Sequence, residues 1–395
     1  GFLQTDLWGL PGSARRVKGD VHLFQKTIAG QDYLARVRCP MLYLSASNDF
    51  NAPMDFVEKG MKLIPHDKTR TTYAPHLNHR FTPETEIARP LWFDAHLKKR
   101  LQFPHTPLAE LVLKRENGIP IYRVRPDASL PIDQVDIYYG YERDPRNRFW
   151  ADGQAKEQAG VWEAECPVFD LDEPLFAFVN VYYRLSEEQR RRGDPDRFVI
   201  SAAEMAYPVA LRDANVKASE RPRRLVDDFS RGFHDWYTLN LSNRHHWLFA
   251  TRKVVDPRWE APHGAKLSFE IEPSESGNTL AVQLKTDSWR FYSGKKPDMW
   301  TALVHLPKSG RQHVDLTIDA FKNSSGEMLS DWHGLTELIF QSGAKAQPSK
   351  IDELKHWRGK VPAFSNLHWT GGEPLTRQKP FLPMDSSSTE SHATD

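Results

Sequence analysis

The first hundred residues show a pattern of hydrophobic positions typical of alternating strands and helices. Residues 40–44 form a short continuous apolar run, as in a strand buried on both faces of a parallel sheet. Pro53 then begins a helix with apolar residues on one side, residues 69–74 form a second strand, and Pro83 begins a second helix whose apolar residues are spaced by four. This order predicts an α/β region over about residues 1–103.

From about residue 104 the pattern changes to alternating apolar and polar positions, which is typical of half-buried strands. Residues 134–141, 161–166 and 175–183 are such runs, separated by turn sequences rich in Asp, Pro and Asn. We expect these strands to form a β-sandwich over about residues 104–215, with most of their aromatic side chains in its core.

A second alternating region, over about residues 216–372, predicts another all-β domain. Its strands are expected at residues 267–271, 280–284, 302–306, 314–318 and 335–340. Five such runs at hairpin spacing favour a sandwich or jelly roll. The serine-rich residues 373–395 predict a disordered tail. The predicted fold class is therefore α/β, followed by two all-β sandwich domains.

Composition narrows the class of partner. The 395 residues include 53 Lys and Arg against 52 Asp and Glu, so no overall charge favours nucleic acid or an anionic membrane surface. No apolar run reaches the length of about 18 residues that a membrane-spanning helix needs. Cys39 and Cys166 each lie beside a proline in an apolar run, which predicts buried free thiols instead of a disulfide. No motif indicates a cofactor.

Two polar residues lie where an open α/β sheet places its chemistry, after the carboxyl ends of strands. Asp49 follows the first predicted strand and His79 follows the second. A histidine that acts as a general base needs a carboxylate to hold its tautomer and to stabilise the imidazolium, and Asp49 is placed to serve His79 in this way. Asp55 and His76 are the nearby alternates. A simpler interpretation stays open, with Asp49 a turn residue and His79 an ordinary surface histidine.

The nucleophile expected beside such a pair is missing. In hydrolases with the order Ser, Asp, His, the serine lies in a G-x-S-x-G turn between a strand and a helix. No such sequence occurs here, and the nearest approach, residues 228–232, lacks the first glycine. The chain also begins with Gly1 instead of Met. These features predict a processed or truncated product, with any targeting signal upstream of the visible chain.

The segments C-P-M-L-Y-L-S-A-S-N-D-F, A-P-H-L-N-H-R-F and L-W-F-D-A-H-L lie within residues 37–97. This stretch resembles the carboxyl-terminal part of α/β-hydrolases of the dienelactone hydrolase and acetyl xylan esterase type, in the branch of the PhoPQ-activated pathogenicity-related proteins. The resemblance implies catalytic roles for Asp49 and His79 and a partial α/β-hydrolase sheet over residues 1–103. The other strands of that fold have no counterpart here. We therefore expect exposed sheet edges and poor packing of this region unless another polypeptide supplies the missing strands.

The two all-β regions carry resemblances of their own. A tyrosine-rich strand followed by G-x-W-x-A at residues 160–164 resembles the immunoglobulin-like domain appended to the same hydrolases. Residues 225–230, followed by Trp236, resemble the opening strand of galactose-binding-like sandwich modules of the carbohydrate-binding type. Related modules often hold a structural calcium ion, which this resemblance would place at Asp227 and Asp228. No other metal site is predicted.

Aromatic residues are concentrated in the last region, where eight of the twelve tryptophans lie within residues 236–369. A sugar ring offers C–H faces to an aromatic plane and hydroxyls to charged or amide groups, so aromatic residues beside polar ones are candidates for binding it. The candidates are Trp247, Trp289, Tyr292 and Trp300. The alternative, that these side chains fill the core of the sandwich, is equally open.

Three functions from different classes remain. The favoured one is a truncated serine-type ester hydrolase for acylated carbohydrate, secreted or periplasmic, and inactive as it stands because the serine is absent. In this hypothesis His79 is the base and Asp49 its orienter. The alternatives are a non-catalytic carbohydrate-binding protein built on two β-sandwiches, with a polysaccharide as partner, and a subunit completed by a separate chain that supplies the serine. Whether the chain is an enzyme stays open at this point.

Overall fold

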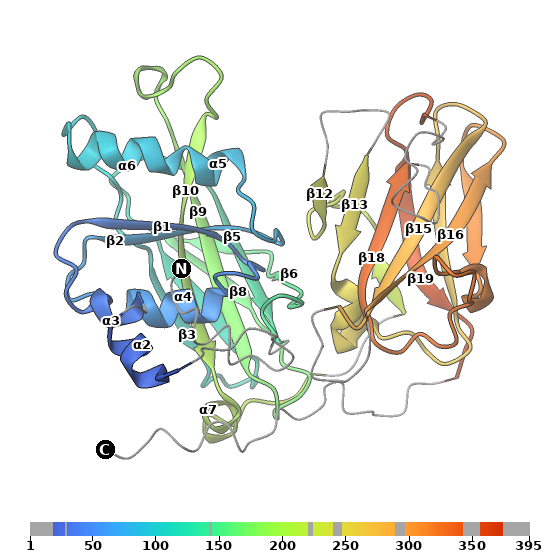
Figure 1. The fold of residues 1–395 in the computed structure, drawn as a ribbon, viewed down its shortest axis with the longest axis horizontal. Helices are drawn as coiled ribbons and strands as arrows, with labels where there is room; N and C mark the ends of the chain where they lie inside the picture. Colours follow the sequence, from blue (N-terminus) through green and yellow to red (C-terminus); the bar gives the residue numbers. More distant parts are fainter. Residues whose placement is uncertain are drawn as a thin grey trace.

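Strands dominate the structure, a computed structural model that describes residues 19–27, 30–141, 144–219, 224–239, 247–288, 297–342 and 356–373. They form two bodies, which lie on the left and on the right of Figure 1. The first body extends to about residue 219 and the second begins at about residue 224. Residues 374–395 of the predicted tail lie outside the described residues.

The α-helices of the described chain all belong to the first body. They are α2 (Val21–Thr27), α3 (Gln31–Leu34), α4 (Met54–Met61), α5 (Pro83–Glu86), α6 (Ala88–His96) and α7 (Pro208–Asp213), and the 3-10 turns are η1 (Glu187–Gln189), η2 (Lys253–Val255), η3 (Pro257–Trp259) and η5 (Ile318–Ala320). Pro53 precedes α4 and Pro83 begins α5, as the sequence predicts. The helix expected after Pro83 is divided at Ile87 into α5 and α6.

Two sheets of the described chain form the first body. The larger contains, in spatial order, β1 (Met41–Ala46), β2 (Thr69–Ala74), β10 (Arg197–Ala206), β9 (Leu175–Arg184), β5 (Ile132–Gly140) and β6 (Ala151–Asp152). The smaller contains β3 (Leu108–Val112), β4 (Ile121–Arg125), β8 (Val161–Glu165) and β7 (Lys156–Gln158). The predicted division at residue 103 therefore separates strands that share one sheet.

The predicted partial α/β-hydrolase sheet is wrong. Strands β1 and β2 do pair in parallel, but β2 then pairs in an antiparallel direction with β10. The backbone N–H of Tyr73 donates to Oγ of Ser201 at 2.9 Å, and the side-chain amide of Asn180 donates to the carbonyl of Tyr73 at 2.9 Å. Because these bonds satisfy the free edge of β2, the two parallel strands extend an antiparallel sheet. In the described chain only β1 keeps an open edge on this side.

Strand β9 is the centre of the first body, since it is buried on both faces. On one face, Val179 packs in the same core cluster as Tyr122 of β4 and Trp92 of α6. On the other face, Phe178 packs with Val57 of α4. Apart from Asn180, residues 175–183 are apolar, which fits this three-layer arrangement because both sides of the strand need apolar residues.

The second body consists of two sheets over a shared core, as the alternating pattern predicts. One contains β11 (Leu225–Asp227), β19 (Ala363–Thr370), β14 (Lys266–Glu272) and β17 (Gln312–Leu316), and the other contains β12 (Tyr237–Leu239), β13 (Leu248–Thr251), β18 (Leu335–Ser342), β15 (Asn278–Thr286) and β16 (Asp298–Leu306). Phe340 of β18 stacks on Phe364 of β19 with ring centroids 4.7 Å apart, which joins the two sheets. We therefore describe this body as a β-sandwich.

The two cysteines differ in exposure. Cys166 is buried, and burial raises the pKa of its thiol to about 12. Cys39 is exposed, so the expected burial of this thiol is wrong. It lies in the bend before β1 instead of inside the strand. Both cysteines are free, as predicted.

Candidate binding site between the two bodies

The structure brings the side chains of Asp49 and His79 together. Asp49 follows β1 and His79 follows β2, so the parallel pairing of these strands puts both residues at one edge of the sheet. The Asp49 carboxylate accepts a hydrogen bond from Nδ1 of His79, with 3.0 Å to Oδ2 and 3.2 Å to Oδ1. Asp49 is buried, whereas the side chain of His79 is 57% exposed. Their catalytic role stays a prediction.

Asp49 also serves the turn that follows β1. Its Oδ1 accepts hydrogen bonds from the backbone N–H groups of Asn51, at 2.7 Å, and of Ala52, at 3.1 Å. This is the turn-forming role of an aspartate in a loop. The same carboxylate therefore both stabilises the turn and holds the imidazole of His79.

The two alternates are engaged elsewhere. Asp55 forms a bidentate ion pair with Arg148, at 2.7 and 2.9 Å. His76 is buried between the rings of Tyr138 and Phe149, with centroid distances of 5.6 and 6.2 Å. Burial lowers the pKa of His76 to about 3, so this imidazole is neutral at physiological pH.

His79 lies on the wall of a cavity of about 420 Å³ between the two bodies. From the first body the cavity is lined by Phe50, Leu77, Asn78, His79, Arg80 and Asn147. A larger cavity, of about 790 Å³, lies beside α4, β2 and β10 and includes neither Asp49 nor His79. We take the smaller cavity, named the junction pocket below, as the candidate site because both bodies contribute side chains to it.

From the sandwich, the junction pocket is lined by Tyr237, Arg252, Lys285, Ser288, Thr336 and Glu337. These residues come from β12, β15, β18 and the end of β13, which belong to one sheet. That sheet turns its inner face to the core of the sandwich. Its outer face therefore supplies the polar wall of the pocket.

Glu337 is the centre of this polar wall. The hydroxyl of Tyr237 donates to its carboxylate, and Nζ of Lys285 contacts the same group. The guanidinium of Arg252 lies 3.8 Å from Oε1 of Glu337 and stacks over the ring of Tyr237 at 4.8 Å. Arg252 also donates from Nη1 to the carbonyl of His76 at 2.7 Å, which ties the wall to the first body. Burial raises the pKa of Glu337 to about 8.

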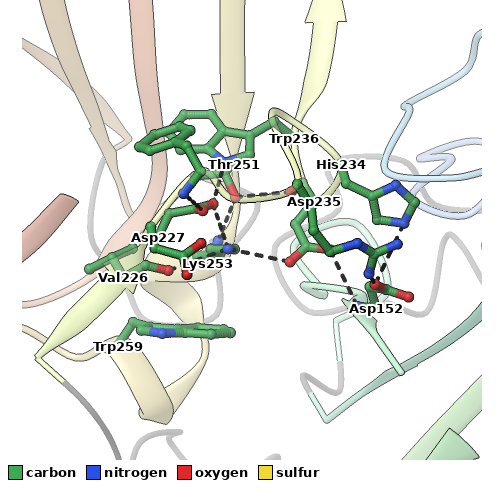
Figure 2. A network of polar contacts seen from close by, with 12 residues as sticks. Asp152, Val226, Asp227, His234, Asp235, Trp236, Thr251, Lys253 and Trp259 are labelled. Carbon is green, nitrogen blue, oxygen red and sulfur yellow. Dashed lines mark hydrogen bonds and ion pairs between the residues drawn. The ribbon is translucent and has the colours of Figure 1, made fainter. Parts of the chain in front are cut away.

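A second set of polar contacts, shown in Figure 2, also holds the two bodies together. The buried ammonium of Lys253 donates to Oδ2 of Asp227 at 2.7 Å and pairs with Oδ2 of Asp235 at 3.3 Å. Oδ1 of Asp235 accepts from the backbone N–H of Asp152 in β6 at 3.3 Å. Arg231 of the sandwich contacts the carboxylate of Asp152. Because Lys253 directly follows Arg252, this network also positions the pocket wall.

Three residues at or next to the pocket have a left-handed backbone. His76, His79 and Asp287 all have positive φ, at 61°, 47° and 50°. A residue with a side chain is uncommon in this left-handed region, and such strain persists where the surrounding structure enforces it, often at ligand sites. His76 and His79 lie in the loop after β2, and Asp287 precedes the pocket residue Ser288.

The aromatic residues predicted from the sequence do not form this site. Trp247 is 1% exposed and packs in the sandwich core, so its indole has no surface to offer to a sugar. Trp300 of β16 is half-buried and donates from Nε1 to Oγ1 of Thr286 at 3.2 Å, and it does not line the junction pocket. Trp289 and Tyr292 lie outside the described residues.

The predicted calcium position is occupied by other groups. The Asp227 carboxylate binds the ammonium of Lys253 and the indole N–H of Trp236, the latter at 2.8 Å. Asp228 accepts hydrogen bonds from Ser230. Across the ranges that the structure describes, no group of three or more His, Cys, Asp and Glu side chains gathers as a metal site. The same ranges contain no helix that is long and apolar enough to cross a membrane.

Sequence reasoning missed the residues of the sandwich wall, Tyr237, Arg252, Lys285 and Glu337. One signal was available at Glu337, because it is the one charged residue in the largely apolar segment 335–340. A charged residue in such a run, buried with its strand, indicates a partner or a site more often than a solvated surface.

Comparisons with known proteins give little further guidance. No family model matches the chain, and no curated protein matches it. Among solved structures, the chain is similar to one described as the structural basis for the promiscuous specificity of carbohydrate-binding modules from the β-sandwich superfamily. The identity is 9%, the match covers 68% of this chain and 99% of the other, and the TM-score is 0.20. A TM-score this low does not establish a common fold.

Proposed function

We propose that this protein binds carbohydrate without catalysing a reaction, and that the junction pocket is its binding site. One observation carries the proposal: the pocket combines aromatic rings, from Phe50 and Tyr237, with hydrogen-bonding side chains from both bodies. Sugars present both kinds of surface, since their C–H faces pack on rings and their hydroxyls donate and accept hydrogen bonds. The volume of about 420 Å³ lies in the range of about 300–1,000 Å³ typical of small-molecule sites.

The lining suits hydroxyl groups in particular. The side-chain amide of Asn78 can donate, and the hydroxyl oxygen of Thr336, which donates to the carbonyl of Lys285, can accept. Arg80 and Lys285 offer donors only. A polyol with several neighbouring hydroxyls can bond to such a mixed set at once, which an apolar ligand cannot do. The finer assignment of the two β-rich parts, as an immunoglobulin-like domain and a galactose-binding-like module, belongs to this proposal, as does a secreted or periplasmic location.

The test is isothermal titration calorimetry of the full chain against a panel of oligosaccharides, with affinity electrophoresis on polysaccharide gels as a screen. We expect Phe50→Ala to lower the affinity for the tightest-binding saccharide by about tenfold, a value typical of a lost aromatic contact. Phe93→Ala is the matched control, because Phe93 is 53% exposed on α6 and does not line the pocket. Absence of binding to every saccharide tested, or equal weakening by both variants, would overturn the proposal.

A second function is favoured by the hydrogen bond between Asp49 and His79. This pair has the geometry of a general base and its orienting carboxylate, so an ester-hydrolysing site whose serine comes from a separate chain is the other candidate. We expect the purified protein alone not to hydrolyse p-nitrophenyl acetate. Hydrolysis that disappears in a His79→Ala variant would contradict this expectation and would favour an enzyme.

A further inference from the structure

We propose that the junction pocket selects saccharides that carry an anionic group, either the carboxylate of a uronate or a sulfate ester. The inference rests on the proposed function and names its substrate class. It follows from the charges on the pocket wall. Three side chains of the lining are cationic, those of Arg80, Arg252 and Lys285. Among the described residues that line the pocket, Glu337 alone carries a carboxylate.

The single carboxylate does not neutralise these cations. Glu337 is contacted by Lys285 and lies near Arg252, so at most one negative charge faces these two cations. Arg80 is exposed at the opposite wall and has no ion pair with any described residue. His79 lies beside Arg80 and donates from Nδ1 to the carboxylate of Asp49. Even with this second carboxylate counted, the three cations outnumber the two carboxylates. The pocket therefore holds an excess of positive charge.

This excess is a local feature of the pocket. The whole chain is nearly balanced, with a formal net charge of +1, so anion binding would not be a property of its general surface. Inside a partly buried site, an uncompensated cation interacts more strongly with an entering anion than it would at an exposed surface.

The geometry of the cations fits an oxyanion. A guanidinium donates two parallel hydrogen bonds to a carboxylate or a sulfate, and an ammonium adds a point charge beside it. Arg252 is held in place by its bond to the carbonyl of His76 and by its stacking on Tyr237. A positioned guanidinium loses less conformational freedom when the ligand binds. The neutral part of the sugar would then lie against Phe50 and Tyr237.

The experiment compares three ligands of equal length by calorimetry with the full chain: an oligogalacturonate, a sulfated galacto-oligosaccharide and a neutral galacto-oligosaccharide. We expect at least one anionic ligand to bind about tenfold or more tightly than the neutral one, as for a charge-assisted hydrogen bond. The preference between the first two ligands distinguishes a carboxylate from a sulfate. Raising the salt concentration should weaken only the anionic ligands.

Two pocket variants and one control complete the design. Arg80→Gln and Lys285→Gln are each expected to weaken binding of the anionic ligand about tenfold. The affinity for the neutral ligand should change by less than about twofold. Arg311→Gln removes the same charge outside the pocket. Arg311 follows the Leu306 end of β16, whereas the Asp298 end pairs with Thr286 beside the pocket. We expect this control to leave every affinity unchanged.

The outcomes separate the inference from the function on which it rests. Binding of the neutral ligand as tightly as the anionic ones would overturn the inference and leave carbohydrate binding in place. Equal weakening by all three variants would also overturn it, because the anion would then bind to general surface charge. If none of the three ligands binds and no saccharide of the wider panel binds either, both the inference and the proposed function are wrong.

Discussion

Acidification is expected to destabilise this protein through one buried imidazole, that of His76. The residue is 5% exposed, its ring lies between Tyr138 and Phe149, and its Nε2 has no hydrogen-bond partner in the described chain. Its backbone links the two bodies, since the N–H donates to Oγ of Ser47 at 2.8 Å and the carbonyl accepts from Arg252 at 2.7 Å. A proton on this ring would place an unpaired charge at the junction.

The size of the effect follows from the pKa shift. The pKa of His76 is lowered from 6.5 to about 3, mainly by burial; Asp235 opposes this shift, and Arg252, His234 and Lys253 contribute to it. Between these two values the unfolded chain binds a proton at this position and the folded chain does not. Stability is therefore lost as the pH falls below 6.5, by about 1.4 kcal/mol for each pH unit. At pH 5 the loss is about 2 kcal/mol.

Urea unfolding at pH 7 and pH 5 measures this loss. We expect a His76→Phe variant, which keeps a ring between Tyr138 and Phe149, to lose about 2 kcal/mol less than the wild-type chain over this range. His333→Phe, at an exposed position, is the control and should lose as much as the wild type. An equal loss in the His76→Phe variant, or an imidazole proton resonance of His76 that titrates near pH 6.5, would refute the reasoning.

Three more predictions follow from buried contacts. Lys253→Met should lower the free energy of unfolding by about 2–3 kcal/mol in thermal denaturation, because it leaves two half-buried carboxylates without their cation. The exposed Lys308→Met should have little effect. Gly140→Ala should cost about 1–3 kcal/mol by urea unfolding, since its Cβ would overlap a backbone carbonyl oxygen. In the native protein Cys39 should react with Ellman's reagent, and the buried Cys166 should react only after unfolding. Rapid reaction of both thiols would contradict the burial of Cys166.

The parts of the fold that depend on local pattern could be predicted from the sequence. The strands expected at residues 267–271, 280–284, 302–306 and 335–340 lie within β14, β15, β16 and β18. In these strands, alternate side chains face the shared core of the sandwich. The alternation of apolar and polar residues in the sequence therefore shows which of them are buried. The positions of Asp49 and His79 could be predicted because each residue follows a short strand that is recognisable in the sequence.

The pairing between distant segments could not be predicted. Strand β2 pairs with β10 at Thr71 and Ser201, which are 130 residues apart, and the buried side chains of Asn180 and Ser201 complete the hydrogen bonds of this edge. Nothing in the period of either strand indicates such a partner. The sequence of two strands, each followed by a helix, therefore predicts an α/β sheet, although the next strand in the sheet, β10, is antiparallel to β2.

The junction pocket escaped prediction because it depends on how the two bodies meet. Glu337 and Lys285 lie on strands whose inner faces build the sandwich core, and the outer faces of such strands are usually exposed to water. Here the first body covers them. Apart from the signal at Glu337, each segment alone predicts an ordinary solvated side chain, and the site arises only when both bodies are placed together.

The polar character of the junction argues that it serves a ligand more than it serves stability. Arg252, Lys253 and Glu337 are each at most 7% exposed. Removing such charges from water costs several kcal/mol for each ion, and apolar side chains of similar volume would join two domains at least as well. Polar groups that surround a cavity, in contrast, can exchange their water for the hydroxyl and anionic groups of a ligand. The charges of Arg252 and Glu337, which line the pocket, therefore support the proposed ligand site. The affinity variants test that proposal more directly than any measurement of stability.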